Sequence, residues 1–247
     1  FFVSHCDIPY KVTDYTLDSY VRQMRRRVLE PLAEKYGVDT SDAAIRKAVA
    51  EHNEVCAIIS EIGEMRKADN PVITGYEFHV LNLVSFTCPK QLILPYLRET
   101  LEELKTRKPD AKPPFRARVA IVGSEIDDPN LTKLIESCGA LVVSDRYCFG
   151  STPGREIIHL RDDEDALDTA DRLAKEFHAD GIIYEQMKYC DYWGFERALV
   201  SHIMHEEYNW PVLSIDRLYN NGNSGQLRTR VQAFVESLEI KKLHKNG

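Results

Sequence analysis

The sequence predicts an α/β protein in which a mainly helical N-terminal half precedes a parallel β-sheet with helices on both faces. Three observations support this prediction. Before residue 107, apolar residues recur at helical spacing. Residues 107–115 are polar and rich in proline, and after them short apolar runs alternate with helical patterns. We therefore expect a first part over 1–106, a linker over 107–115 and an α/β domain over 116–247.

The first half begins with a helical stripe of apolar residues between Leu17 and Leu32. Pro31 should kink or restart this helix, because proline lacks the backbone N–H that a helix interior needs, and Gly37 should end it. Thr40 or Ser41 should cap a second helix. The rest of this half is expected to contain a break at 69–71, a helix over 76–86 and a further helix that starts at Pro89.

Beyond the linker, four short apolar runs have the length and composition of buried strands. They lie at 119–122, 140–143, 181–184 and 211–215. Helical patterns follow the strands in turn, at 131–138, 166–177, 195–207 and 227–238. This alternation is typical of a parallel sheet, because each crossover helix returns the chain to the same edge.

The composition is that of a globular protein, with 43% hydrophobic and 29% charged residues among 247. The formal net charge of −7, from 32 basic and 39 acidic residues, argues against a dedicated nucleic-acid binder. No apolar run approaches the roughly 18 residues that a membrane span needs, and no signal peptide is recognisable, so we expect a cytoplasmic protein. The first residue is Phe1 rather than Met, so we expect a processed chain, a fragment or a sequence that lacks its beginning.

Three of the six cysteines stand where predicted strands end. Cys148 and Cys190 follow the second and third strands of the predicted sheet, and Cys6 follows the apolar run 1–3, which has the pattern of the last strand of an earlier domain. Ligands of open parallel sheets bind beyond the carboxyl ends of the strands. Glycines beside Cys148 would let the backbone approach a bulky inorganic centre. These positions favour a cluster held by three distant cysteines, with buried, inert thiols as the alternative.

The other cysteines are expected to be structural. Cys56 and Cys138 lie on apolar helical stripes, and Cys88 stands just before the helix that starts at Pro89. Several functional motifs are missing from the sequence: a CxxC pair, a glycine-rich dinucleotide fingerprint after the first strand, a P-loop and a GxSxG elbow. An HxxH pattern at 202–205 lacks the glutamate of a metalloprotease, so we expect it to be a solvated helix face.

Four stretches resemble subunits of the 2-hydroxyacyl-CoA dehydratase and benzoyl-CoA reductase family. They are VSHCD at 3–7, DRYCFGS at 145–151, GIIYEQMKYCD at 181–191 and SGQLRTRVQAF at 224–234. The last two are the most specific, and the resemblance extends over nearly the whole chain. It implies two Rossmann-like α/β domains with helical segments. The chain would then contain the end of a first α/β domain, a mainly helical segment and a complete Rossmann-like domain at its C-terminus.

In that family, three cysteines at these places hold one [4Fe–4S] cluster per subunit. The resemblance therefore assigns the metal ligands as Cys6, Cys148 and Cys190. The residues expected around the cluster or the substrate lie in strand-end loops or at the start of the last helix, and they are Ser124, Gly150, Ser151 and Gln226. The chain departs from the family pattern at Thr152, in lacking a substantial N-terminal region, and in a shorter segment before the third strand.

The resemblance implies an enzyme that passes low-potential electrons to an acyl-CoA thioester through a ketyl radical. A separate ATP-dependent iron–sulfur activator would supply the electron, and a related partner subunit would complete a heterodimer or a larger assembly. The loop over 146–156 favours the benzoyl-CoA reductase branch, in which an aromatic acyl-CoA is reduced. The close alternative is radical dehydration of a 2-hydroxyacyl-CoA. A non-catalytic electron-relay subunit and an α/β binding domain with incidental thiols are the other hypotheses.

Overall fold

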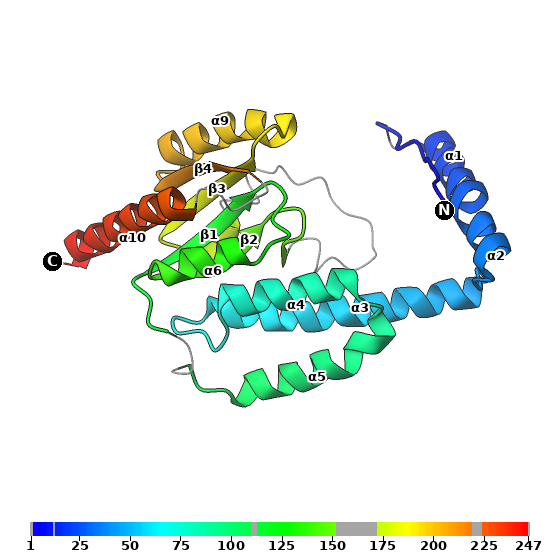
Figure 1. Cartoon of the computed structure of the whole chain (residues 1–247), viewed down its shortest axis with the longest axis horizontal. Helices are drawn as coiled ribbons and strands as arrows, with labels where there is room; N and C mark the ends of the chain where they lie inside the picture. Colours follow the sequence, from blue (N-terminus) through cyan, green and yellow to red (C-terminus); the bar gives the residue numbers. More distant parts are fainter. Residues whose placement is uncertain (1, 12, 110–112, 152–171, 219–223, 247) are drawn as a thin grey trace. The chain divides into compact units, whose positions relative to one another are not determined.

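A computed structural model describes residues 2–11, 13–109, 113–151, 172–218 and 224–246 (Figure 1). The chain forms two compact units, which we call unit 1 (residues 1–51) and unit 2 (residues 52–247). No helix in the described ranges is long and apolar enough to cross a membrane.

Unit 1 is built from helices in the part that the structure describes. They are α1 (Asp14–Met24), the π-helical turn η1 (Arg25–Leu29), α2 (Glu30–Tyr36) and the first half of α3 (Asp42–Glu64). Pro31 lies in the first turn of α2, where its missing N–H has no helical partner to lose, and Gly37 ends α2 with φ of 65°. The Ser41 hydroxyl accepts a hydrogen bond from Ala44 N and caps α3. The predicted helix restart, stop and cap are all confirmed.

The prediction of a strand at 1–3 is wrong for its described residues, because residues 2–9 form no regular structure. The side chain of Val3 is 62% exposed, so it is not part of a buried sheet. A strand needs a neighbour to take its backbone hydrogen bonds, and the described residues of unit 1 form only helices and irregular segments. A run of three apolar residues is too short to distinguish a strand from an extended segment.

Unit 2 contains a parallel sheet of four strands in the order β2-β1-β3-β4. The strands are β1 (Ala117–Gly123), β2 (Ala140–Arg146), β3 (Gly181–Met187) and β4 (Val212–Arg217). Each overlaps a predicted strand, so the α/β class and the parallel sheet are confirmed. β2 and β3 extend three residues further than their apolar runs, and these extensions carry charged residues to the carboxyl edge of the sheet.

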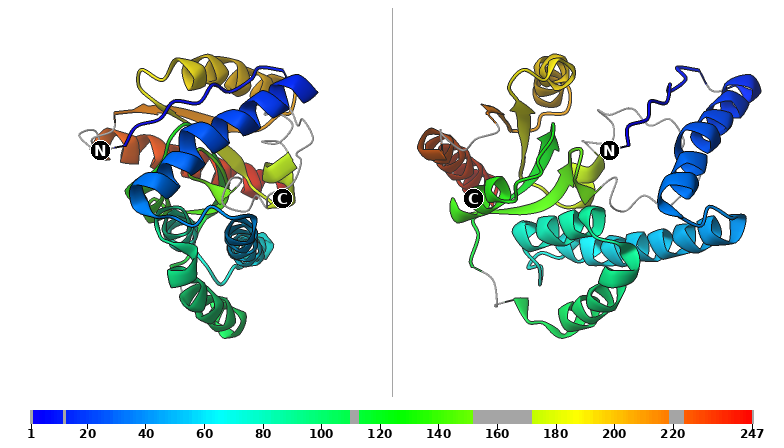
Figure 2. Two further views of the ribbon diagram at one scale, coloured as in Figure 1. Left: turned by 90° about the vertical axis from the view of Figure 1, so that its right-hand side faces the viewer. Right: turned by 45° about the vertical axis from the view of Figure 1, so that its right-hand side comes forward.

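Helices cover both faces of this sheet (Figures 1 and 2). On one face α6 (Asn130–Ser137) and α10 (Ser224–Asn246) pack against alternate strand residues such as Val119 and Ile183. On the other face α9 (Asp191–Glu206) packs against residues of opposite orientation, such as Tyr184. α9 begins four residues before the predicted start, and α10 is longer than predicted at both ends. Of the helix predicted over 166–177, residues 166–171 lie outside the described residues, and 172–176 are helical.

The helical segment of unit 2 packs on the sheet through α4. After α3 come the 3₁₀ turn η2 (Met65–Lys67), α4 (Gly75–Thr87) and α5 (Lys90–Thr106), which share a buried core. Gly75 is needed for the close approach to β2, because a Cβ there would lie 2.4 Å from Val142 Cβ. The Glu136 carboxylate accepts hydrogen bonds from Gly75 N and Tyr76 N at the positive end of α4. The boundary at 107–115 stays a prediction about domains.

Candidate functional site

The candidate site lies at the carboxyl edge of the sheet, where three strands deliver their following loops. All strands are parallel, so the residues after β1, β2 and β3 emerge at the same edge. Because β1 lies between β2 and β3, its loop stands between the loops that carry Cys148 and Cys190. The sheet order therefore brings two predicted ligands to the two sides of Ser124.

Ser124 links the two cysteine loops by hydrogen bonds. Its carbonyl accepts a hydrogen bond from Cys148 N at 3.3 Å, and its hydroxyl accepts one from Met187 N at 2.6 Å. The hydroxyl donates in turn to Glu185 Oε2 at 2.9 Å. Ser124 is 1% exposed, so these bonds form away from water. The residue is thus a structural junction of the site, in the place where the sequence predicted a site residue.

A buried ion pair lies behind Ser124. Glu185 is fully buried and Arg217 nearly so, and Arg217 Nε lies 2.8 Å from Glu185 Oε1, in a geometry that is an ion pair but not an aligned hydrogen bond. Arg217 Nη2 donates to the carbonyl of Glu125 at 2.7 Å, which holds the loop after β1. Burial raises the pKa of the Glu185 carboxyl, and the Arg217 charge and the Ser124 hydroxyl oppose that shift.

Cys148 presents a thiol at this edge. The residue is exposed, yet partial burial of the thiol raises its pKa, and a hydrogen bond with the Trp193 side chain opposes that rise. The charges of Glu125 and Cys190 also raise the pKa of Cys148. Hydrogen bonds through Ser124 connect the loops that carry Cys148 and Cys190, and a shared metal site at the two thiols stays a prediction.

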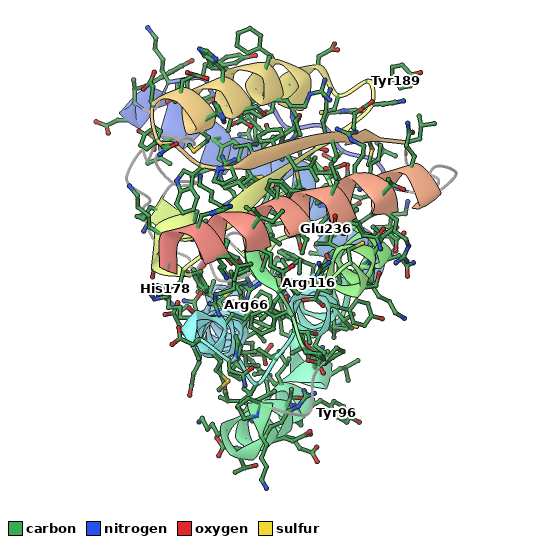
Figure 3. All side chains as sticks on the ribbon, turned by 90° about the vertical axis from the view of Figure 1, so that its left-hand side faces the viewer. Arg66, Tyr96, Arg116, His178, Tyr189 and Glu236 are labelled. Carbon is green, nitrogen blue, oxygen red and sulfur yellow. The ribbon has the colours of Figure 1, made fainter. Side chains whose placement is uncertain are left out.

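Cys190 stands at the start of α9, as its N-terminal flanking residue. Its N–H donates to Met187 O at 3.2 Å, and its carbonyl accepts from Gly194 N at 2.9 Å, so both backbone groups are held. Tyr189 adopts a positive φ of 71° in the turn before it, and its ring points away from the protein at 91% exposed (Figure 3). As a residue, Cys190 is half-buried, whereas Cys148 is exposed.

The loop after Cys148 folds back on the end of β2. Ser151 Oγ donates to the carbonyl of Asp145 at 3.0 Å, and Ser151 N donates to Asp145 Oδ1. Gly150 is needed here, because a Cβ would lie 2.6 Å from Asp145 Oδ1. From the helical segment of unit 2, the buried Asn82 of α4 donates a hydrogen bond to the carbonyl of Phe149 at 3.1 Å. Gly150 and Ser151 thus shape the Cys148 loop.

Two predicted site residues are not joined to this group by the structure. Cys6 is half-buried in unit 1, and its part in a common site stays a prediction. Gln226 is exposed in the first turn of α10, and its approach to the cysteines also stays a prediction. Within the described ranges, no three His, Cys, Asp or Glu side chains are arranged to hold a metal ion.

The cysteines predicted to be structural are so. Cys56 is 2% exposed and Cys138 is 3% exposed, and Cys138 lies in the core shared by α6, α10 and the sheet. Burial raises the pKa of the Cys138 thiol, which makes it a poor nucleophile. Cys88 flanks the end of α4 and packs against the α3–α5 core. The histidines of the HxxH pattern are exposed, as expected for a solvated face.

The charged residues that support the loops are not among the site residues that the sequence predicts. Glu185 follows the buried residue Tyr184 in β3 and Arg217 ends β4, and a charge near the carboxyl end of a buried strand is a usable sign of a site. Asp145 has the corresponding position near the end of β2. Arg66 had no such sign, because it lies at the end of a helix and meets Asp145 only through the tertiary fold.

A parallel sheet covered on both faces, with two cysteine-bearing loops at its carboxyl edge, defines an α/β protein. The sequence profile of the family "2-hydroxyglutaryl-CoA dehydratase, D-component" matches residues 2–238. The chain therefore belongs to this family, which confirms the predicted 2-hydroxyacyl-CoA dehydratase relationship.

Two curated relatives agree with this assignment. YjiM of Escherichia coli (strain K12), provisionally described as a dehydratase subunit, is 21% identical over 94% of this chain and 67% of its own length. The (R)-phenyllactyl-CoA dehydratase beta subunit of Clostridium sporogenes is 24% identical over 89% of this chain and 63% of its own length. The chain thus spans about two thirds of the length of these relatives. Both descriptions are of dehydratase subunits, so the preference for the benzoyl-CoA reductase branch has no support from them.

Proposed function

We propose that this chain is the iron–sulfur subunit of a radical 2-hydroxyacyl-CoA dehydratase. The observation that carries the proposal is that the loops bearing Cys148 and Cys190 leave the same edge of the sheet and are hydrogen-bonded through Ser124, in a chain of the dehydratase family. These two residues come from separate loops more than forty positions apart in the sequence, so the connection between their loops is a product of the fold. Inert thiols need no such arrangement.

The residues at the edge suit a [4Fe–4S] cluster with Cys6, Cys148 and Cys190 as its thiolate ligands. Cys148 is accessible, and Gly150 lets its loop turn back tightly without a side chain in the way. Two thiolates come from unit 2, and the third would come from Cys6 of unit 1. A cluster bound through three thiolates would supply low-potential electrons and one iron open to a substrate oxygen.

The other residues of the site hold these ligands in place. Ser124 joins the two loops through its carbonyl and hydroxyl groups. The Glu185 carboxylate, which is paired with Arg217, accepts the hydrogen bond from the Ser124 hydroxyl, and the oxygen of that hydroxyl accepts the hydrogen bond from Met187 N. Such supporting hydrogen bonds orient metal ligands and tune the metal that they bind. Ser151 and Gln226 are proposed to line the substrate or the cluster, together with Ser124 and Gly150.

The substrate that we propose is a 2-hydroxyacyl-CoA, which loses its hydroxyl group and one hydrogen as water to give an enoyl-CoA. We also propose a related partner subunit and a separate ATP-dependent iron–sulfur activator. The name of the Clostridium sporogenes relative, a beta subunit of a phenyllactyl-CoA dehydratase, supports both the reaction class and a multi-subunit enzyme. Reduction of an aromatic acyl-CoA and electron relay without turnover are the competing functions.

The test is turnover by the anaerobically purified complex with its partner subunit, an ATP-driven activator and either a 2-hydroxyacyl-CoA or benzoyl-CoA. We expect enoyl-CoA from the first substrate and no ring reduction of the second, as measured by mass spectrometry of the CoA esters. Ring reduction of benzoyl-CoA without dehydration of the 2-hydroxyacyl-CoA would show that the enzyme is a reductase rather than a dehydratase. A complex that takes up electrons from the activator but turns over neither ester would identify a relay subunit.

A further inference from the structure

A fully buried ion pair joins the helical segment of unit 2 to the end of β2. Arg66, in the turn η2, is 1% exposed, and its Nη1 donates to Asp145 Oδ2 at 2.8 Å. The guanidinium also lies over the Phe78 ring, with 3.7 Å from Cζ to the ring centroid (Figure 3 labels Arg66). Asp145 is 2% exposed, so both charges are removed from water.

This pair is a poor device for stability alone. Nε and Nη2 of Arg66 lack a hydrogen-bond partner among the described residues, although both atoms are buried. Buried ion pairs with unmade hydrogen bonds are often no better for stability than apolar residues of the same size. A specific geometric role for the Asp145 carboxylate would account for the pair.

The carboxylate has such a role in the loop that carries Cys148. One carboxylate oxygen of Asp145 accepts the hydrogen bond from the Arg66 guanidinium, and the other accepts the hydrogen bond from Ser151 N. Gly150 lies so close to this second oxygen that any side chain would collide with it. The loop from 147 to 151 is therefore wrapped around the Asp145 carboxylate, and Arg66 fixes where that carboxylate points.

We propose that Arg66 is a positioning residue for Cys148, which it acts on through Asp145 and the loop 147–151. It touches neither the thiol nor a substrate. The proposal uses the proposed function only in giving Cys148 a ligand role, since the effect of Arg66 on the loop exists without a cluster. The helical segment around η2 and α4 would thus belong to the site, through Arg66 and through the contact of Asn82 with Phe149.

A second buried arginine provides a matched control. Arg118 is 6% exposed, and it donates to the carbonyls of Ala68 at 2.7 Å and Phe177 at 2.9 Å. It lies near the start of β1, at the opposite end of the sheet from Cys148. Its Nη2 also donates to the carbonyl of Arg66 at 2.9 Å. Arg118→Met therefore removes a buried guanidinium of the same size and a backbone contact of η2, but it leaves the Arg66–Asp145 ion pair and the hydrogen bonds of the cysteine loop with all their partners.

The experiment compares Arg66→Met, Arg66→Lys and Arg118→Met as folded, cluster-free protein. The rate at which iodoacetamide alkylates each cysteine is measured by mass spectrometry of its peptide. For Arg66→Met we expect the alkylation rate to change at least threefold at Cys148 and less than twofold at Cys190. For Arg118→Met we expect no change in the alkylation rate at either cysteine. Buried Cys138 reports general opening of the protein, and we expect its rate to stay low in all three variants.

Arg66→Lys keeps the charge and should bring the rate at Cys148 back at least half of the way to the wild-type value. The proposal is overturned by a wild-type rate at Cys148 in Arg66→Met, or by equal changes at Cys148, Cys190 and Cys138. If Arg66→Met does not fold, the proposal is judged from the alkylation rate at Cys148 in Arg66→Lys. A rate within the error of the wild-type rate overturns the proposal, and a twofold change in the rate supports it. If neither variant folds, Arg66 is a core stabiliser and the positioning role is rejected.

Iron retention after anaerobic reconstitution is the second readout, and we expect Arg66→Met to retain less iron than Arg118→Met. Absence of iron from the reconstituted wild type would contradict the proposed function. The positioning role of Arg66 would then be judged from the alkylation rates alone.

Discussion

The cysteines of unit 2 occupy two settings, a packed apolar core and the loops that follow the strands. Cys138 is enclosed by apolar side chains of α6, α10 and the sheet, and burial leaves it a small hydrophobic residue. Cys148 and Cys190 stand in strand-end loops that are held by backbone hydrogen bonds and joined through Ser124. The comparison teaches that placement in the fold, rather than residue type, decides which thiols are available for chemistry.

The largest expected effect comes from removing a loop thiol. Cys190→Ala should abolish turnover of the complex while the protein still folds. A half-buried loop residue contributes little core burial, so the free energy of unfolding should fall by about 1 kcal/mol or less. Turnover and denaturant unfolding are measured on the same preparation, and retention of more than a tenth of wild-type turnover would break the distinction between the two settings.

Ser124→Ala should sharpen the comparison, because this residue joins the two loops without being a ligand. The change leaves Met187 N and the Glu185 carboxyl without their buried partner, so we expect a loss of about 1–3 kcal/mol in unfolding free energy. Ser137→Ala, at an exposed serine of α6, is the control and should stay within about 0.5 kcal/mol. Equal effects in urea unfolding would show that Ser124 is not a junction.

The core thiol should behave in the opposite way to Cys190. Cys138→Ala creates a small cavity in a packed core, so it should cost roughly 1–2 kcal/mol of stability. Turnover per folded molecule should be unchanged, because Cys138 lies away from the strand-end loops. A Cys138→Ala protein with normal stability and reduced turnover would mean that the two settings have been assigned the wrong way round.

A smaller effect concerns pH and the residues that hold the Cys148 loop from the helical side. His79 is buried, donates from Nε2 to the Ile126 carbonyl and accepts at Nδ1 from the Thr132 hydroxyl. Burial lowers its pKa below the ordinary 6.5, so the unfolded chain binds a proton more readily. This stability is fully present above pH 6.5 and is lost as the pH falls through the lowered pKa of the folded state.

Urea unfolding at pH 8 and at pH 5.5 checks this prediction. The wild type should lose more stability between the two values than His79→Gln, which cannot take up the proton. An equal loss in both proteins would show that His79 does not contribute to the acid sensitivity of the fold.

The sheet could be predicted because its strands are short apolar runs separated by helical patterns, and this information is local. The start of α9 was placed four residues late, since Asp191 to Gly194 mix polar and aromatic residues without a helical stripe. The apolar run 1–3 was read as a strand because composition alone does not supply a pairing partner. Local pattern therefore indicates element type better than it indicates boundaries or pairing.

The site could be predicted as far as its loops, because parallel strands place their following residues at one edge. This rule predicts Cys148, Cys190 and Ser124 at the edge, and the structure places the loops that carry them there. The support from Arg66 could not be found, because its ion pair joins residues 79 positions apart and depends on how η2 packs on β2. Glu185 and Arg217 meet across neighbouring strands, and only the strand order reveals that they pair.

The central claim is that the loop cysteines, and not the core cysteines, hold a [4Fe–4S] cluster. The direct measurement is iron and sulfide per chain in anaerobically purified protein, for the wild type and for Cys6→Ala, Cys148→Ala, Cys190→Ala and Cys138→Ala. We predict close to four iron and four sulfide per wild-type chain and per Cys138→Ala chain, with loss of most of both in each of the other three variants, because affinity depends on ligand count. Normal iron in Cys190→Ala with loss of iron in Cys138→Ala would contradict the account.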